Sequence, residues 1–350
     1  MTLRTSYRDS YLILAGLLVL TLIASMAIGA FVFSPGQMLR FTGEKLGWLA
    51  QDPADTLDGN VFFLLRLPRV LLCGLTGAIL GLSGTVMQGL FRNPIVEPGL
   101  AGTSAGAALG AAAVFVLGEQ SLSFLSPLGT AAVPLTAFAG AFAATMFVWK
   151  LSTRFHHTDV FTLLLAGIAV NAMCNAGTGF LSYIARDPQA RNISFWNLGA
   201  FTTADWHRTL IVAAVFLACL VPTLRHGKSL NALMLGEENA GYLGVDPQRL
   251  IFRLLLVNTA MVAAATAMVG VIAFVGLVVP HLLRLVRSSD YTFLLPASAL
   301  LGAVLMEAVD IVARVVIAPA ELPVGIITAL IGAPFFLWLL FTQGRSRTDG

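Results

Sequence analysis

Charged residues are scarce in this sequence of 350 residues. Lysine, arginine, aspartate and glutamate make up only 11% of it, whereas hydrophobic residues make up 57% and the mean hydropathy is +0.84. A soluble globular protein typically carries about 25% charged residues. This chain therefore has too little charge to cover the surface of a soluble domain of its length, and an ordinary soluble fold is excluded.

Excess basic charge and cysteine are equally limited. The 21 lysine and arginine residues are scattered and exceed the 18 acidic residues by only three, which argues against a nucleic-acid partner. The three cysteines, Cys73, Cys174 and Cys219, each lie in an apolar run without a CxxC or His–Cys grouping. We interpret them as small buried hydrophobic residues, and we expect no metal site and no cofactor.

Catalytic motifs are missing as well. The sequence has no Ser/His/Asp set, no HExxH motif, and no glycine cluster followed by the Lys-Ser/Thr of a phosphate-binding loop. Its five histidines fall in predicted loops or near the ends of apolar runs. The sequence therefore predicts a chain that is not an enzyme, and an active transporter built from it would need a separate motor.

Long apolar runs are what the sequence does contain. Ten of them approach or exceed the roughly 20 residues that cross a bilayer. Spans are predicted at residues 11–33, 67–90, 99–118, 127–149, 160–184, 208–224, 251–269, 271–286, 292–317 and 323–342. The basic start leads directly into the first run, with no small-residue cleavage site, so we interpret it as a span rather than a removable signal. The predicted fold class is an all-α polytopic membrane protein with one transmembrane domain, residues 1–350.

The basic residues also predict an orientation. With the N-terminus in the cytoplasm, 13 of the 21 lie in cytoplasmic segments and eight on the other side, as the positive-inside rule requires. An even number of spans then places both termini in the cytoplasm, in a bacterial inner (plasma) membrane.

Glycine spacing suggests a possible internal repeat. The pattern in residues 77–94 echoes that in residues 270–280, as an inverted repeat of two halves, about 1–184 and 208–342, would produce. Chance clustering in a glycine-rich membrane protein explains the echo about equally well. In either case, glycines three or four apart allow helix backbones to pack closely.

Five motifs carry a resemblance to a known family over about residues 60–342. They are Arg66-Leu67-Pro68-Arg69, Gly84-Thr85-Val86-Met87-Gln88, Asn93-Pro94-Ile95-Val96-Glu97-Pro98-Gly99, Phe274-Val275-Gly276-Leu277-Val278-Val279-Pro280-His281 and Glu321-Leu322-Pro323-Val324-Gly325. In this order they resemble the FecCD-type permeases of ABC importers for ferric siderophores, heme and cobalamin. The resemblance implies a type II ABC importer permease fold with ten membrane helices. It also implies two permease subunits around a central pathway, here a homodimer, with two ATPase subunits beneath and a periplasmic substrate-binding protein outside.

The resemblance also implies contacts for three arginines. In this family the residues matching Arg66 and Arg69 meet acidic residues of the binding protein, and Arg314 resembles a third such contact. Arginine suits this role because its planar guanidinium binds a carboxylate through two hydrogen bonds. The competing interpretation of Arg66 and Arg69 is anchorage at the membrane interface.

The one sizeable inner loop, about 225–250, is the predicted coupling loop. Residues 235–245 are interpreted as a short helix that is apolar on one face and bounded by glycines. The stretch resembles the family's coupling element, which docks into a groove on the ATPase, although a plain cytoplasmic loop is the alternative. The candidate coupling residues are Gly236, Glu237, Glu238, Ala240, Leu243 and Gly244.

Two acidic residues within an apolar span offer a different hypothesis. Glu307 and Asp310 are costly at membrane depth unless they are paired, and Arg314 stands one helical turn beyond Asp310. We interpret Asp310 and Arg314 as a structural ion pair. If these carboxylates instead cycled between charge states, the chain would be an ion-coupled secondary transporter.

The substrate is predicted from residues 181–191 and the Phe195-Trp196 pair that follows. This stretch resembles the heme branch of the family more than the cobalamin branch. Heme is flat, apolar and carries two propionates, so its pathway needs apolar walls and a few cations. The candidate pathway residues are Tyr183, Arg186 and Arg191. Heme is the preferred substrate, followed by a ferric siderophore and then by cobalamin.

Overall fold

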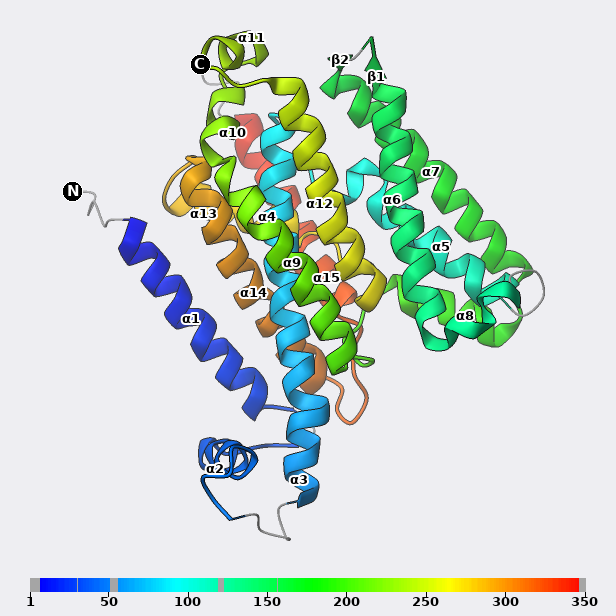
Figure 1. The fold of residues 1–350 in the computed structure, drawn as a ribbon, viewed down its shortest axis with the longest axis vertical. Coiled ribbons are helices and arrows are strands. Elements are labelled where there is room, and N and C mark those ends of the chain that lie inside the picture. Colours follow the sequence, from blue (N-terminus) through cyan, green and yellow to red (C-terminus); the bar gives the residue numbers. More distant parts are fainter. Residues whose placement is uncertain (1–6, 30, 51–55, 119–122, 156, 346–350) are drawn as a thin grey trace.

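The computed structural model describes residues 7–29, 31–50, 56–118, 123–155 and 157–345. It is a bundle of helices with one small hairpin (Figure 1). The helices are α1 Tyr7–Ala27, α2 Pro35–Lys45, α3 Thr56–Val61, α4 Leu67–Leu90, α5 Thr103–Leu117, α6 Ala132–Ser152, α7 Val160–Ile184, α8 Asp187–Asn197, α9 Trp206–Arg225, α10 Gly227–Leu233, α11 Glu237–Tyr242, α12 Pro247–Val269, α13 Val275–Val286, α14 Tyr291–Val315 and α15 Val324–Arg345. The strands are β1 Thr153–Arg154 and β2 His157–Thr158, which pair antiparallel.

The predicted all-α membrane fold is confirmed. Among the described residues, seven helical segments are long and apolar enough to cross a membrane, and three shorter apolar helices, α5, α13 and α15, bring the total to ten. Each of the ten overlaps one predicted span.

Aspartates mark where four of the membrane helices begin. The side chains of Asp159, Asp205, Asp246 and Asp290 accept hydrogen bonds from backbone N–H groups in the first turns of α7, α9, α12 and α14. These N–H groups have no partner inside the helix, so a capping carboxylate satisfies them. The loops between spans therefore end at positions that the sequence itself specifies.

The spans predicted from residues 99 and 271 begin later than expected because the chain breaks at their start. The span predicted from residue 99 becomes α5 at Thr103, after a short 3-10 turn at Pro98–Ala101, and the span predicted from 271 becomes α13 at Val275. Gly270 and Phe274 adopt positive φ values of 84° and 69°, which a continuous right-handed helix does not allow. The apolar composition of these segments concealed the breaks, because the chain remains buried where it is not helical.

Helix α4 lies at the centre, and glycines bring its neighbours close. A Cβ placed on Gly77 or Gly81 would collide with the backbone of α14, and one placed on Gly84 would collide with Gly276 of α13. Such small residues allow close helix packing in membranes, where burial in lipid gives no hydrophobic drive for helix association. The predicted role of the closely spaced glycines is confirmed.

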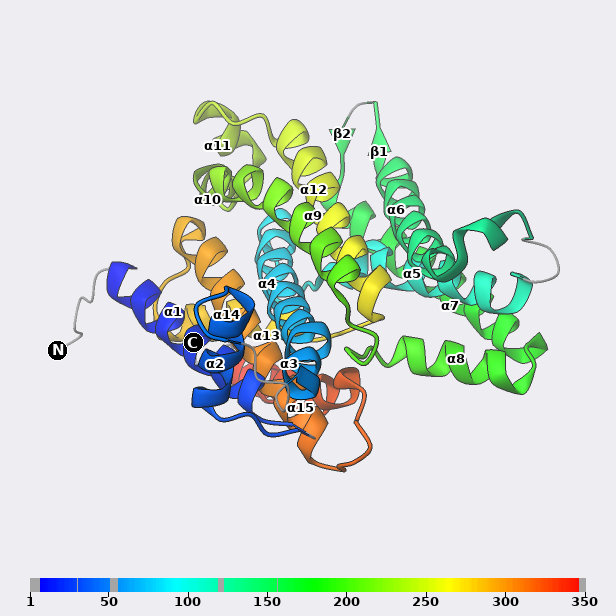
Figure 2. The ribbon, with the colours of Figure 1, turned by 60° about the horizontal axis from the view of Figure 1, so that its bottom comes forward.

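The outer helices expose large apolar surfaces. Only 11% of the α1 span and 22% of each of the α7 and α9 spans is buried, against 89% for the span containing α4. Helices α5 to α8 form a group beside the central helices in both views (Figures 1 and 2). These exposed apolar faces suit lipid or another protein chain.

The two ends of the bundle carry different elements. Helices α10 and α11 and the β1–β2 hairpin lie at one end, toward which α1 begins, and α2 and α3 lie at the other (Figure 1). The segments predicted to be cytoplasmic therefore share one end. Their assignment to the cytoplasm, and the relation between the two halves of the chain, stay predictions.

Candidate functional site

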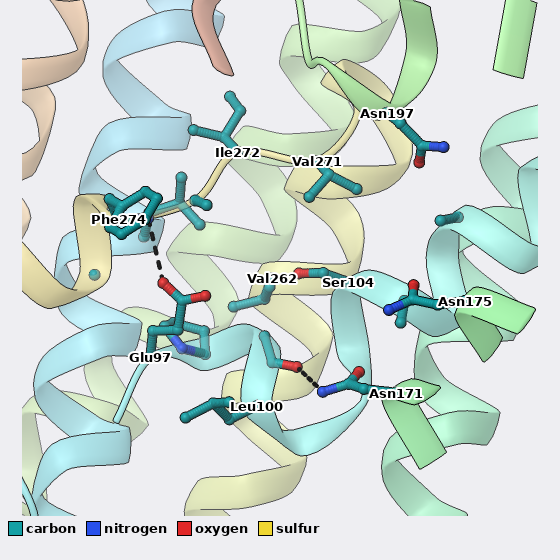
Figure 3. Close-up of a pocket in the computed structure, with 17 residues that line it drawn as sticks. Glu97, Leu100, Ser104, Asn171, Asn175, Asn197, Val262, Val271, Ile272 and Phe274 are labelled. Carbon is teal, nitrogen blue, oxygen red and sulfur yellow. Dashed lines mark hydrogen bonds between the residues drawn. The ribbon is translucent and has the colours of Figure 1, made fainter. Parts of the chain in front are cut away.

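A polar cavity of about 290 Å³ lies beside the middle of α7. Its walls come from the segment between α4 and α5, from α7 and α12, and from the non-helical residues before α13 (Figure 3). The two breaks in the predicted spans therefore meet at this cavity. Non-helical backbone at membrane depth is tolerated where it is buried in protein or lines a cavity, and here it does the latter.

One carboxylate stands in the wall. Glu97 Oε2 accepts a hydrogen bond of 3.2 Å from the backbone N–H of Phe274, which joins the two broken segments (Figure 3). The lining residues include no lysine, arginine or histidine. The cavity wall thus carries an acidic group without a basic partner in the wall.

Amide side chains face the same space from α7. Asn171 lies close to the midpoint of this helix, and its Nδ2 donates a 3.1 Å hydrogen bond to the carbonyl of Gly99. Its Oδ1 is buried and has no hydrogen-bond partner among the described residues. Asn175, one turn further on, is exposed, and Ser104 and Asn197 also line the cavity (Figure 3). Polar groups halfway along a membrane helix are costly in lipid, so they face protein or a water-filled space.

The structure does not bring the predicted pathway residues into this cavity. Tyr183 lies near the end of α7 and is 87% exposed, and Arg186 and Arg191 lie at the start of α8 and on α8, also exposed. The Arg191 guanidinium stacks over the ring of Phe195 at 5.4 Å. These residues face outward at one end of the bundle, and their role in the pathway stays a prediction.

Sequence reasoning missed the residues that do line the cavity. A signal was present, because Asn171 and Asn175 interrupt an apolar run at a spacing of four residues and so share one helix face. Glu97 entered the sequence analysis only as part of a family motif. The chain turns at this motif, since α4 ends at Leu90 and a short 3-10 turn begins at Pro98.

The three predicted docking arginines share a second cavity, of about 240 Å³, at the end of the bundle near α3. Arg69 contacts two carboxylates, Asp310 at 2.9 Å and Glu321 at 2.9 Å. Its side chain is 13% exposed, and that of Glu321 is 29% exposed. Arg69 is thus already paired, partly within reach of solvent.

The other two arginines are more deeply buried. Arg66, 7% exposed, donates hydrogen bonds to the carbonyls of Ile28 and Phe31 at 3.0 and 2.8 Å. Arg314, 3% exposed, pairs with Asp310 at 3.0 Å and donates to the Ser25 carbonyl at 3.1 Å. Both therefore hold the end of α1 and the chain that follows it. Their predicted contact with a binding protein stays untested.

The two acidic residues of α14, Glu307 and Asp310, differ in their contacts. The predicted ion pair between Asp310 and Arg314 is confirmed. Glu307, one turn earlier, is fully buried and forms no ion pair among the described residues.

The predicted coupling stretch forms a short helix, α11, at the opposite end of the bundle. Gly236 and Gly244 flank it with φ values of 101° and 80°, a conformation that favours glycine. Ala240 is fully buried, whereas Tyr242 and Leu243 are 89% and 62% exposed. Glu238 is also exposed. The helix therefore rests on the bundle through one side and presents apolar side chains on the other.

The loop carrying α11 is fastened to α14 through α10. Asn231 on α10 donates a 2.7 Å hydrogen bond to Asp290, the cap of α14. Partial burial raises the pKa of the Asp290 carboxyl, but hydrogen bonds from Asn231 and Thr292 outweigh it and lower the pKa below its usual value. Asp290 thus stays ionised and keeps this loop anchored.

A bundle of apolar membrane helices with a polar cavity beside the middle of one of them is the architecture of a membrane transport protein. The chain belongs to the FecCD transport family, whose model matches residues 17–342. It is accordingly a non-catalytic permease subunit of an ABC importer.

Two curated relatives are similar over most of their length. The hemin transport system permease protein HmuU of Yersinia pestis is 44% identical over 289 residues, covering 83% of this chain and 85% of that one. The vitamin B12 import system permease protein BtuC of Salmonella typhi is 38% identical over 330 residues, covering 94% of each.

Solved structures agree with this assignment. A structure described as an inward-facing conformation of a metal-chelate type ABC transporter superposes with a TM-score of 0.80 at 33% identity, covering 94% of this chain and 97% of that one. PsaBC from Streptococcus pneumoniae, solved in complex with a Fab, gives a TM-score of 0.54 at 18% identity, covering 81% of this chain and 94% of that one. The second likeness shows the fold alone.

Proposed function

We propose that this permease carries heme from a periplasmic binding protein to the cytoplasm, powered by a separate ABC ATPase. The observation that supports heme is the 44% identity with a hemin permease over 83% of this chain. Vitamin B12 and ferric siderophores are the competing cargoes, because a vitamin B12 permease is 38% identical over a longer stretch.

The proposed active form is a homodimer of permease subunits with two ATPase subunits. Helix α7 buries only 22% of its span in this chain and exposes Asn175 halfway along. A second copy facing α7 would cover its apolar residues and enclose the polar cavity. The pathway would then run between the two copies, with Glu97 and the α7 asparagines in its walls.

Helix α11 is the proposed contact for the ATPase. It is exposed at one end of the bundle, and Leu235, Tyr242 and Leu243 present apolar surface there. An apolar patch on an exposed segment is typical of a protein interface. The proposed binding-protein contact lies at the opposite end, at the cavity that contains Arg66, Arg69 and Arg314.

Uptake by proteoliposomes tests this function. The vesicles contain the permease with its ATPase on the inner face, and the binding protein is added outside. They should accumulate hemin only when ATP is enclosed with the ATPase. Equal amounts of vitamin B12 and of a ferric hydroxamate siderophore serve as competing cargoes. Uptake of either cargo without hemin uptake would replace heme by that cargo.

The same vesicles distinguish an ion-coupled secondary transporter. Such a protein would need a carboxylate that changes its charge state. The candidates are Asp310, held by both Arg69 and Arg314, and Glu307, buried without an ion pair among the described residues. Because the chain belongs to a family of ABC permeases, we expect ionophores that collapse proton and sodium gradients to leave ATP-driven uptake unchanged. Uptake that needs a gradient and no ATP would favour the secondary transporter.

A further inference from the structure

Glu237, the first residue of α11, contacts three separate segments of the bundle. Its Oε1 lies 3.5 Å from Arg92 Nη2, its Oε2 lies 3.6 Å from His157 Nε2, and Oε2 accepts a 3.2 Å hydrogen bond from Gln248 Nε2. Arg92 follows α4, His157 belongs to the β1–β2 hairpin, and Gln248 stands in the first turn of α12. One carboxylate thus joins α11 to three elements that are distant in the sequence.

A second contact strengthens the connection to the hairpin. Gln248 Oε1 accepts a 2.6 Å hydrogen bond from the backbone N–H of Thr158. Gln248 therefore binds Glu237 with one end of its amide and the hairpin with the other. The hairpin is thus held to α11 through Gln248, and His157 lies beside the same carboxylate.

Both branches continue to the walls of the polar cavity. Thr158 directly precedes Asp159, the cap of α7, and α7 carries Asn171 and Asn175. Arg92 lies two residues after the end of α4, with a φ of 49°, and its segment runs on to Glu97. Each of these two walls is therefore linked along the backbone to a residue that contacts Glu237. Helix α7 is linked to His157, and the segment containing Glu97 is linked to Arg92.

The neighbouring Glu238 is arranged differently. It follows Glu237 on the same short helix, but it is exposed and forms no ion pair among the described residues. The two adjacent glutamates thus face different environments. Glu237 points back to the permease, and Glu238 points away from it.

We propose that Glu237 is a positioning residue that transmits movement of α11 to α7 and to the segment containing Glu97. The inference rests on the proposed contact between α11 and the ATPase, and it adds the route by which that contact reaches the pathway. A rigid displacement of α11 would carry Arg92 and the hairpin with it, because Glu237 and Gln248 bridge all three. Without Glu237, α11 would move while the cavity walls stayed in place.

The first test is the ratio of transported cargo to hydrolysed ATP in the assembled complex. Glu237→Ala should leave ATPase binding and ATP hydrolysis intact, and should lower uptake per ATP by about two- to thirtyfold, the range that mutations within coupled networks produce. Lys228→Ala, which truncates an exposed side chain of the same loop on α10, serves as the matched control and should not change the ratio. A wild-type ratio in Glu237→Ala would overturn the proposal.

Charge exchange separates a specific contact from a general loss of structure. Glu237→Arg should lower the ratio, and adding Arg92→Glu should restore part of it, because the exchanged charges can pair again. No restoration in a complex that still binds its ATPase would count against the Arg92 branch and with it the proposal.

A distance measurement tests the joint directly, whatever the transport rate. Spin labels at Asn239→Cys and Phe155→Cys, both exposed and outside the proposed ATPase surface, would report the separation of α11 and the hairpin in a background with the three native cysteines replaced by alanine. The distribution should stay narrow with and without ATP and should broaden in Glu237→Ala. Identical distributions in the two proteins would overturn the proposal.

The proposed ATPase contact can fail separately. If Leu243→Asp leaves ATPase binding unchanged, α11 is not the coupling helix and the proposed contact is wrong. If Leu243→Asp abolishes binding while Glu237→Ala keeps a wild-type ratio, only the role of Glu237 is wrong.

Discussion

Arg69 on α4 donates a 2.9 Å hydrogen bond to Asp310 on α14, a residue 241 positions further along the chain. Asp310 also pairs with Arg314 at 3.0 Å and is fully buried. One carboxylate therefore balances two guanidinium groups between the two central helices. Removing one member of a buried ion pair leaves an uncompensated charge, which costs more than the pair itself contributes.

We predict that Asp310→Ala destabilises the permease by about 3–5 kcal/mol, the usual cost of breaking a buried ion pair. Thermal unfolding in detergent should show a large decrease in midpoint, or too little folded protein to measure. Glu321→Gln is the matched control, because Glu321 contacts the same Arg69 but is 29% exposed, and its loss should cost about 1 kcal/mol or less. Equal effects of the two substitutions would contradict this account.

Most of the fold could be predicted from the sequence because a bilayer demands long apolar helices. The run at 160–184 became α7 with the same boundaries, and the pairing of Asp310 with Arg314 followed from their spacing of four residues. The aspartate caps can also be recognised in the sequence, since Asp159 and Asp290 directly precede the helices they cap. Local rules of this kind need no knowledge of distant contacts.

The cavity could not be predicted in the same way, because long-range contacts create it. Glu97 binds the backbone of Phe274, a residue 177 positions away, and nothing in either local sequence specifies the other. Tyr183 and Arg191 were chosen for their chemistry, yet the fold places them at an exposed end rather than beside the cavity. A polar or charged residue in a loop does not reveal which side of the bundle it faces.

Helix α11 provides the second prediction. Leu243→Asp should separate the ATPase from the permease, because it places a charge in the exposed apolar surface that we assign to this contact. Co-purification from membranes would measure the loss, and the permease alone should unfold at its normal temperature. Leu39→Asp, at a position 75% exposed on α2 at the other end of the bundle, is the control and should leave the complex intact.

The third prediction concerns Glu321, which forms an ion pair with Arg69 in the permease without its binding protein. If the binding protein offers its own carboxylate to Arg69, Glu321 competes with it. Glu321→Gln should then tighten binding of the binding protein, whereas Arg69→Gln should weaken it, each by roughly the 0.2–1 kcal/mol of an exposed ion pair. Titration of the binding protein onto permease in nanodiscs at low salt would measure both.

The sign of these two effects decides the third prediction. A docking arginine requires opposite changes, which should diminish as added salt screens the charges. A purely structural Arg69 would make both variants bind equally well or weaken both together. The buried Arg66 and Arg314 are less suitable for this test, because their loss would also release the end of α1.

The last prediction separates transport from stability at the polar cavity. Asn171→Leu and Asn175→Leu replace two amides midway along α7 with leucine, an apolar side chain that is favourable at the centre of a membrane helix. We expect the double variant to fold and to assemble with its ATPase normally, because Asn171 forms only one hydrogen bond and Asn175 is exposed. Uptake should nevertheless fall, since the wall would lose the polar groups that we assign to the pathway. Met173→Leu, at a position 67% exposed on the same helix, is the control and should transport normally. If the asparagine variant and the control both transport at the wild-type rate, the cavity is not part of the pathway, and the pathway lies elsewhere.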